Sequence, residues 1–538
     1  MLPESDGDTS GRVTGNSIRA PQPWPRTLAD MTSDQTTHPA PSSGQPITLE
    51  QVDGLTDLDP EALRVALHAA VEVVVEHLTG LPDRPVFPLI EPGSLVGLFP
   101  SSAPEGPEPL ERILADHQAL VEPNATQWQH PGFMAYFPTS ASAAGIVGEL
   151  LMTTLAQNPM LWRTSPIGTE LEQVVVGWLR QAVGLPADFD GFITDTASTS
   201  SLIALGAARE QAGLDAAALG LAGRGDLGAP RIYASQEAHS SIEKAAMTLG
   251  IGRRNVIRIE TDAEFRMRPE GLAAAISADL AAGYRPMAVV ATLGTTSSTA
   301  VDPIGPIADI AATHGLWLHV DAAYAGFVAM LPERRAEFAG WERADSIVIN
   351  PHKWLFTPID ASLLLTRRMD KLRDAFSLVP EYLRTLDRSS PVRDVNEYTP
   401  QLGRRFRALK LWVLLRWFGL EGLRRRIRHH IAQAAAFGFW VDADPRFERL
   451  APVPFSTICL RFAPPALPGE THEDHETRLD ALNLALIDAV NRTGEVFLSH
   501  TRLRGRFAIR VALGQIRTED RHVARALALL QREAEALG

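Results

Sequence analysis

One lysine stands out in a chain that carries almost all of its positive charge on arginine. Only four of the 51 basic residues are lysines, and a lysine, unlike an arginine, can lose its proton and act as a nucleophile. Lys353 lies in INPHKWLF, directly after the β-branched run SIVIN. Lys244, Lys371 and Lys410 lie in helical, charged or amphipathic segments, where we expect solvated helix faces. Amine chemistry is therefore expected at Lys353.

Polar side chains follow the other strand-like runs of the same region. Asp321 closes LWLHVD, His239 follows RIYAS, and Thr296 follows MAVVATLG. Residues 196–201 follow GFIT and crowd hydroxyl groups at the start of an apolar helix. Ligands of an open α/β sheet bind beyond the carboxyl ends of its strands. We therefore expect these side chains to lie around Lys353.

These groups match the chemical needs of one small cofactor, pyridoxal 5′-phosphate. It requires an amine that forms an imine, a carboxylate that keeps its ring nitrogen protonated, a flat group on the ring face and an anion site. Lys353, Asp321 and His239 can fill the first three roles. Residues 196–201 can fill the fourth, because hydroxyls and free N–H groups at a helix N-terminus bind phosphate.

Each of these residues also has an ordinary structural role. A strand-end Asp is often a turn residue, a lone His is often satisfied structurally, and a Ser/Thr cluster before a helix is often an N-cap. Their occurrence together, each at a separate strand end, favours the cofactor site. The alternatives are another pyridoxal-phosphate lyase or an aminotransferase, which would reuse Lys353 and Asp321, and a non-catalytic protein that retains the fold.

Short β-rich runs alternate with helical segments between residues 191 and 366. This alternation predicts an α/β domain with a mainly parallel, seven-stranded sheet. The expected strands are GFIT (191–194), RIYAS (231–235), NVIRIE (255–260), MAVVATLG (287–294), LWLHVDAA (316–323), SIVIN (346–350) and ASLLLT (361–366). Beyond residue 418, FSTICLRF and RFAIRVAL flank a helical segment and predict a small α+β domain.

The chain is expected to have four parts. Residues 1–48, rich in Pro, Ser, Thr, Gly and Asp, are expected to form a disordered leader. Met31 resembles an alternative start, so that residues 1–30 would not be natively translated. An N-terminal helical segment over 49–130, with an apolar stripe from Asp59 onward, precedes a large cofactor-binding domain over 131–417 and the small domain over 418–538.

Composition limits the classes of partner and location. The formal net charge of −13 argues against broad nucleic-acid binding. The single cysteine, Cys459, excludes an intrachain disulfide. We expect no bilayer-spanning apolar run, no signal peptide and no metal ligand set, and therefore a cytoplasmic protein without membrane contact.

Seven motifs resemble those of the pyridoxal-phosphate-dependent decarboxylases of the aromatic L-amino-acid decarboxylase group. They are HPGFMAYFPT (130–139), SPIGTELE (165–172), HSSIEKA (239–245), ATLGTT (291–296), LHVDAAYAG (318–326), NPHKW (350–354) and LGRRFRALKLW (402–412). The resemblance runs from about residue 59 to the C-terminus. It implies the aspartate aminotransferase fold (fold type I) and decarboxylation of an L-amino acid, with an aromatic one favoured, to the amine and CO₂.

The resemblance also implies residue roles and an assembly. Lys353 would form the imine, Asp321 would pair with the ring nitrogen, and His239 and Ala323 would lie on opposite faces of the ring. The phosphate would be held by Thr196, Ala197, Ser198, Thr296, Asn350 and His352, and the substrate pocket would be lined by Trp128, Pro138 and Thr139. The family works as a homodimer with the active site at the subunit interface, so a homodimer is expected.

Two departures from the family pattern bear on the reaction and the substrate. Val395 stands where a mobile loop of the family carries a tyrosine that protonates the carbanion left by CO₂, and Tyr398 is the nearest substitute. Replacement of that tyrosine accompanies oxygen-dependent aldehyde formation in plant relatives, so an aldehyde is the alternative product. Met160 stands where an aromatic residue often lines the neighbouring subunit's pocket, which allows an unusual substrate range.

Overall fold

The computed structural model describes residue 57, residues 59–378 and residues 393–537. The chain divides into two units, Met1–Leu67 and His68–Gly538. The expected leader, residues 1–48, lies outside the described residues. In the first unit the described residues include the start of helix α2 (Pro60–Gly80), which ends in the second unit. All other described helices and strands belong to the second unit.

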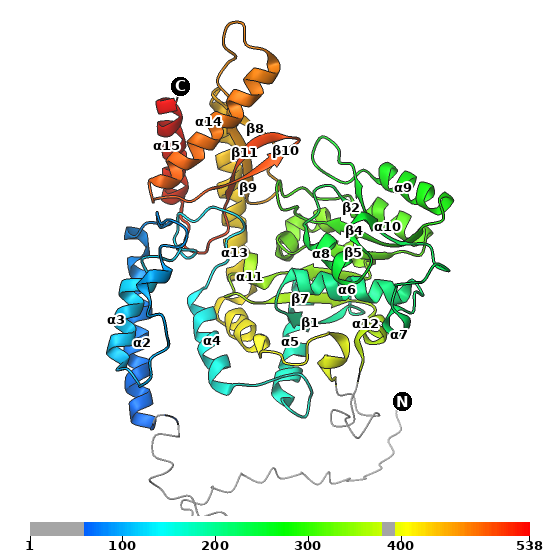
Figure 1. The fold of residues 1–538 in the computed structure, drawn as a ribbon, viewed down its shortest axis with the longest axis horizontal. Coiled ribbons are helices and arrows are strands. Elements are labelled where there is room, and N and C mark those ends of the chain that lie inside the picture. The colour runs from blue at the N-terminus through cyan, green and yellow to red at the C-terminus, as the bar shows by residue number, and fades with distance from the viewer. Residues whose placement is uncertain (1–56, 58, 379–392, 538) are drawn as a thin grey trace, which may run out of the picture. The chain divides into compact units, whose positions relative to one another are not determined.

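A seven-stranded sheet forms the centre of the large domain (Figure 1). Each of the seven predicted runs forms one strand, in the order β1-β7-β6-β5-β4-β2-β3. Strands β2 to β6 pair in parallel, and β7 is antiparallel to both of its neighbours. The bounds are β1 Asp190–Thr194, β2 Pro230–Ser235, β3 Val256–Ile259, β4 Arg285–Thr292, β5 Trp317–Asp321, β6 Ser346–Ile349 and β7 Ser362–Thr366.

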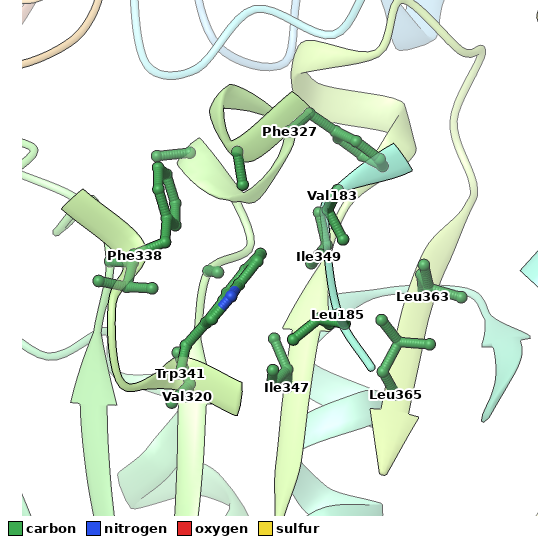
Figure 2. Packing of buried hydrophobic residues seen from close by; sticks show 14 of the residues in the cluster. Val183, Leu185, Val320, Phe327, Phe338, Trp341, Ile347, Ile349, Leu363 and Leu365 are labelled. Carbon is green, nitrogen blue, oxygen red and sulfur yellow. The ribbon is translucent and has the colours of Figure 1, made fainter. Parts of the chain in front are cut away.

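Both faces of this sheet are buried, which explains why its strands read as nearly continuous apolar runs. One face packs on α5 (Pro166–Ala182), α9 (Pro269–Ala281) and α10 (Ile304–Thr313). Figure 2 shows this face, with Val320 and Ile347 near the ring of Trp341, and Leu363 and Leu365 on the side of Phe327. The other face packs on α6 (Ala197–Gln211), α8 (Ser241–Thr248) and α12 (Met369–Phe376).

A small domain follows helix α13 (Arg407–Ala443), whose regular geometry is interrupted at Gly419. Its antiparallel sheet has the order β10-β11-β9-β8 and is covered by α14 (His472–Arg492) and α15 (Asp520–Leu537). Its strands are β8 Phe447–Arg449, β9 Thr457–Phe462, β10 Ser499–Leu503 and β11 Arg506–Ala512. The predicted strands correspond to β9 and β11. The expected boundary at residues 417/418 lies inside α13 and, like the other boundaries, stays a prediction.

The expectation of a solvated face at Lys410 is wrong. Lys410 lies in α13 and is completely buried, because its amine pairs with Glu149 at 2.5 Å and donates to the Pro358 carbonyl at 3.0 Å. Glu149 belongs to α4 (Ala143–Leu155), which packs along α13. Lys410 therefore joins α4 to the turn that follows Lys353.

The N-terminal helices leave apolar surface uncovered in the single chain. Helix α2 has no buried residue, and α3 spans Leu110–Asp116. Among the described residues, Pro60–Asp83 is long and apolar enough to cross a membrane by length and composition, in contrast to the expectation from sequence. The segment carries Glu72 and Glu76 near its middle, and carboxylates are costly inside a bilayer. Length and composition alone are weak evidence for a membrane span.

Candidate active site

A cavity of about 210 Å³ opens at the carboxyl ends of the parallel strands. The chain turns into it after β1, β2, β4, β5 and β6, where strand-end residues converge as an open α/β sheet requires. Its lining comprises Phe137, Thr196, Ala197, Ser198, His239, Ser241, Thr292, Gly294, Thr296, Asp321, Ala323, Tyr324, Asn350, His352 and Lys353. All ten residues predicted to bind the cofactor are in this set.

Lys353 reaches the cavity from α11 (Pro351–Trp354), the short helix that follows β6. Its amine lies 5.2 Å from the centroid of the Phe137 ring and makes no hydrogen bond or ion pair with the described residues. Burial lowers the pKa of Lys353, against the opposing effect of Asp321. The amine is therefore both free and more easily deprotonated than an exposed lysine.

The ring of Trp354, the residue that follows Lys353, is held in an aromatic stack. Trp354 lies parallel to Tyr324 with centroids 4.8 Å apart, and Tyr324 stacks on Phe137 at 3.7 Å. The Trp354 Nε1–H donates to His430 Nδ1 at 3.0 Å. This packing fixes the backbone that carries Lys353.

Asp321 lies at the last position of β5 and is 7% exposed. One carboxylate oxygen accepts a hydrogen bond from the backbone N–H of Ala323 at 3.1 Å. Within the described ranges no other hydrogen bond to this carboxylate is formed. A second oxygen therefore remains for a protonated nitrogen in the cavity.

Helix α6 presents its N-terminus to the cavity. Thr196 is the N-cap and its Oγ1 accepts from the Thr199 N–H at 3.4 Å. The N–H groups of Ala197 and Ser198 have no partner inside the helix, because the first turn of a helix leaves its donors unsatisfied. Together with the Thr296 hydroxyl they form an anion site.

Asn350 and His352 complete the polar wall. His352 Nδ1 accepts from the Ala361 N–H at 3.0 Å, and the Asn350 amide lies 3.3 Å from Nε2. Burial lowers the pKa of His352 to about 3, so the ring is neutral and Nε2 must carry its proton. The structure places Asn350 Nδ2 next to Nε2 and leaves Oδ1 without a partner among the described residues. Because Nε2 is a donor, the amide is more favourable turned over, with Oδ1 toward Nε2 and the NH₂ group free.

His239 stands at the mouth of the cavity, in the loop after β2. Its Nδ1 accepts from the Ser241 N–H at 3.1 Å, which leaves Nε2 free. Partial burial lowers the pKa of His239, with Asp321 opposing and Lys353 adding to the effect. A neutral, planar ring at this position can cover the face of a flat ligand.

The residues present fit pyridoxal 5′-phosphate. Two buried polar atoms in the lining, Thr292 Oγ1 and one atom of the Asn350 amide (Oδ1 as placed), lack partners in the described part of the chain. Unpaired buried polar groups are costly, so they indicate a polar ligand. An amine, a carboxylate and an anion site on separate walls correspond to the carbonyl, ring nitrogen and phosphate of that cofactor.

Some predicted residues lie elsewhere. Trp128, Pro138 and Thr139 do not line the cavity of the single chain, and Trp128 is 37% exposed and stacks on Phe133. Val395 is buried in the cluster formed with α6 and α12, and Tyr398 packs against the same cluster. Neither residue lines the cavity. The described part of the expected loop, residues 393–401, therefore holds both side chains away from Lys353.

Sequence reasoning missed several lining residues and one neighbour. Phe137, Thr292, Gly294 and Tyr324 lie inside motifs quoted above, so their positions were signalled although their roles were not. Arg510 gave no signal: it lies in β11, and its Nε and Nη1 donate to the carbonyls of Ser297 and Tyr136. Its positive charge contributes to the lowered pKa of Lys353.

Comparison with known proteins gives the same assignment. The family model "Pyridoxal-dependent decarboxylase conserved domain" matches residues 92–463, a range that contains every residue of the cavity lining. Phenylacetaldehyde synthase of Arabidopsis thaliana is 39% identical over 492 residues, which cover 90% of this chain and 98% of that protein. Tyrosine decarboxylase 2 of Narcissus pseudonarcissus is 38% identical over 494 residues, with 90% and 96% coverage.

A solved structure shares the fold. The crystal structure of Oryza sativa TDC with PLP and tryptamine superposes with a TM-score of 0.85 at 35% sequence identity. The superposition covers 89% of this chain and 99% of the other. The similarity therefore extends over both the large and the small domain.

Proposed function

Because this chain belongs to the pyridoxal-dependent decarboxylase family, we propose that it converts an aromatic L-amino acid into the corresponding amine and CO₂. The observation that carries the proposal is the cavity in which Lys353, Asp321 and the α6 N-terminus face one another. Its polar groups suit the cofactor, and its remaining wall suits an uncharged substrate side chain.

Pyridoxal 5′-phosphate, when bound, supplies a ring that accepts the electron pair left as the bond between Cα and the carboxylate breaks. Lys353 provides the amine for covalent attachment, and its lowered pKa increases the unprotonated fraction at neutral pH. Asp321 holds a proton on the ring nitrogen through its free oxygen. His239 covers the ring face and carries a proton on Nε2 that it can donate toward Cα.

The charges of the lining favour an aromatic side chain. Lys353 and Asp321 are its formal charges and both serve the cofactor, while His352 is neutral. An acidic or basic substrate side chain would therefore find no counter-ion among the lining residues, at a high desolvation cost. Arg510, a cation outside the lining, is held by the carbonyls of Ser297 and Tyr136. Phe137 offers an aromatic ring instead, already stacked on Tyr324.

We also propose that two copies of the chain pair and complete the substrate pocket. Helices α4 and α5 expose a set of large apolar side chains that a monomer would normally cover. The set consists of Val147, Leu150, Leu151, Leu155, Ile167, Val174 and Trp178. Pairing would bury this surface, and it would allow residues outside the cavity, such as Trp128 and Met160, to approach the cavity of the second copy.

Oxygen-dependent formation of an aldehyde is the second candidate. Val395 and Tyr398 are packed in the core beside α12, so that residues 393–401 supply no phenol to the cavity. Slow protonation would leave the electron pair available to O₂. The balanced reaction consumes the amino acid, O₂ and water and yields the aldehyde, CO₂, ammonia and hydrogen peroxide.

A product balance separates the two reactions. L-phenylalanine, L-tyrosine, L-tryptophan and L-glutamate are supplied separately to the holoenzyme, and CO₂, amine, aldehyde and O₂ uptake are followed. Amine equal to CO₂, with aromatic substrates only, supports the main proposal. Aldehyde equal to CO₂ with matching O₂ uptake supports the second. Preference for L-glutamate would contradict the substrate class, and absence of CO₂ from every amino acid would contradict both.

A further inference from the structure

A buried chain of polar side chains runs from helix α6 to strand β6 behind the anion site. His319 lies at its centre, with Nε2 3.1 Å from Ser201 Oγ and Nδ1 2.8 Å from Ser346 Oγ. The Trp317 Nε1–H donates to the same Ser346 Oγ at 2.8 Å. All four side chains are completely buried. A polar chain at this depth is costly unless each member is paired.

This row of hydrogen-bonded side chains connects the two ends of the cofactor site. His319 and Asp321 are two residues apart in β5, so they lie on the same face of the sheet. That face is covered by α6, and Ser201 stands in α6 one turn behind the Thr196 cap and the free N–H groups. His319 therefore joins the helix of the anion site to the strand of the ring-nitrogen partner.

The protonation state of the ring determines how many of its nitrogens donate. Burial lowers the pKa of His319 to about 4, against the opposing effect of Asp321, so the imidazole is neutral near pH 7. Trp317 can only donate to Ser346 Oγ, and that hydroxyl can still either accept from His319 Nδ1 or donate to it, because it has a proton and a second lone pair. In one tautomer Nε2 donates to Ser201 Oγ and in the other it accepts the Ser201 hydroxyl proton, so the bond to Ser201 forms in both.

A second anchor of α6 is independent of His319. Ser200 Oγ lies 2.7 Å from Thr194 Oγ1 and 3.0 Å from Ser362 Oγ, on strands β1 and β7. The first turns of α6 are thus held at two points, one on each side. Of these two anchors, only Ser201 bonds to β5, the strand that ends at Asp321, through His319.

We propose that His319 is a positioning residue that sets the α6 N-terminus relative to Asp321, so that the phosphate and the ring nitrogen of one cofactor are held together. This inference deepens the proposed function and depends on its cofactor. Its measurable consequence is the preference for pyridoxal 5′-phosphate over pyridoxal, which has the same ring and carbonyl but no phosphate.

The test compares two amides at position 319 in the full-length apoprotein. The Gln side chain places its amide near the position of Nε2 and keeps the bond to Ser201, whereas Asn reaches only the position of Nδ1. His319→Asn should lower the ratio of the two affinities about three- to tenfold, the range expected for one buried hydrogen bond. His319→Gln should keep most of the wild-type ratio. Dissociation constants are measured by absorbance titration with pyridoxal 5′-phosphate and with pyridoxal.

A double-mutant cycle provides the control. Ser201→Ala should lower the ratio of the affinities for pyridoxal 5′-phosphate and pyridoxal as far as His319→Asn does. The double variant should lower this ratio no further than either single variant. Ser200→Ala should combine additively with His319→Asn, because the two anchors are separate. If position-319 variants do not fold, Ser201→Ala alone carries the test, and an unchanged ratio there overturns the inference.

The outcomes distinguish this inference from the cofactor assignment. Equal ratios for His319→Asn and the wild type, or equal weakening of both ligands, would show that His319 only fills the core. Failure of the wild-type protein to bind either ligand would instead contradict the cofactor itself.

Discussion

The reactivity of Lys353 depends on the charges that surround a largely buried amine. Burial lowers its pKa, Asp321 raises it, and Arg510 lowers it again. Arg510 is 4% exposed, and its Nη2 atom has no hydrogen-bond partner among the described residues. Arg510 therefore acts as a buried cation that helps keep the Lys353 amine unprotonated.

Replacing Arg510 with Met should raise the pKa of Lys353, because a nearby positive charge is removed. The unprotonated fraction of the amine would then fall at neutral pH, and attachment of pyridoxal 5′-phosphate should slow by up to about tenfold, one pKa unit. Stopped-flow absorbance measures the rate of cofactor attachment as a function of pH, and the pH profile of this rate should be displaced to higher pH. Arg461→Met, which removes another buried arginine from the same small sheet, is the control, and an equal displacement there would contradict the role of Arg510.

Asp321→Asn should reduce decarboxylation by about 10²-fold or more while some cofactor remains bound. Loss of one partner of a buried charged pair costs about 3–5 kcal/mol, and each 1.36 kcal/mol is tenfold in rate. Asp345→Asn is the matched control, since Asp345 also accepts a backbone bond, from the Leu318 N–H, but precedes β6 and lies outside the cavity lining. Near-normal CO₂ release by Asp321→Asn would show that its carboxylate does not serve the ring nitrogen.

At the scale of single residues, the sequence predicted side chains that follow strands and missed those that approach from other elements. Lys353, Asp321, His239 and Thr196 each lie at the end of an apolar run or within four residues after it, where their chemistry is visible. Arg510 is one of 47 arginines, and only the packing of β11 against residues 136–137 brings it near Lys353. The spacing of residues along the sequence does not reveal such a contact.

Elements were predictable where burial fixed their pattern. All seven strands of the large sheet were found because both of its faces are covered, which leaves continuous apolar runs. Strands β8 and β10 were missed, since β8 is short and β10 has alternating exposed residues with polar composition. The order of the strands and the antiparallel direction of β7 came only from the structure.

Lys410 shows how a helical pattern can mislead, and Val395 shows what its position in the sequence does not reveal. Lys410 was assigned to a solvated face, because an amphipathic pattern does not reveal that Glu149, 261 positions away, provides an ion-pair partner for a buried amine. Val395 was placed at the position of a loop tyrosine, which stays a prediction, and in the structure its side chain packs in the core beside α12. A tyrosine at position 395 would therefore overpack that core instead of placing a hydroxyl in the cavity.

Lys410→Met should destabilise the fold by about 2–4 kcal/mol, because Glu149 loses a buried partner. Glu149 is partly exposed and also pairs with Arg405, which keeps the loss below that of a fully isolated charge. Chemical denaturation measures the change. The double variant Lys410→Met/Glu149→Gln should recover part of the stability, and a loss equal to the sum of the single variants would contradict a direct ion pair.

At the scale of the whole molecule, the exposed apolar faces of α4 and α5 lead us to expect a dimer. Leu151→Arg places a charge in this surface and should convert the dimer to monomers, with CO₂ release falling at least tenfold as the pocket loses its second copy. Analytical ultracentrifugation measures the mass. Leu484→Arg, at a similarly exposed position of α14, is the control and should leave the dimer intact. A monomeric, fully active wild type would contradict the assembly.

Covalent attachment of pyridoxal 5′-phosphate to Lys353 tests the central claim most directly. The full-length apoprotein is incubated with the cofactor, reduced with borohydride, digested and mapped by mass spectrometry. The cofactor mass should occur on the peptide that contains Lys353, and the visible absorption band and all CO₂ release should be absent from Lys353→Ala. Attachment at Lys244, Lys371 or Lys410 instead, or undiminished CO₂ release by Lys353→Ala, would contradict the account.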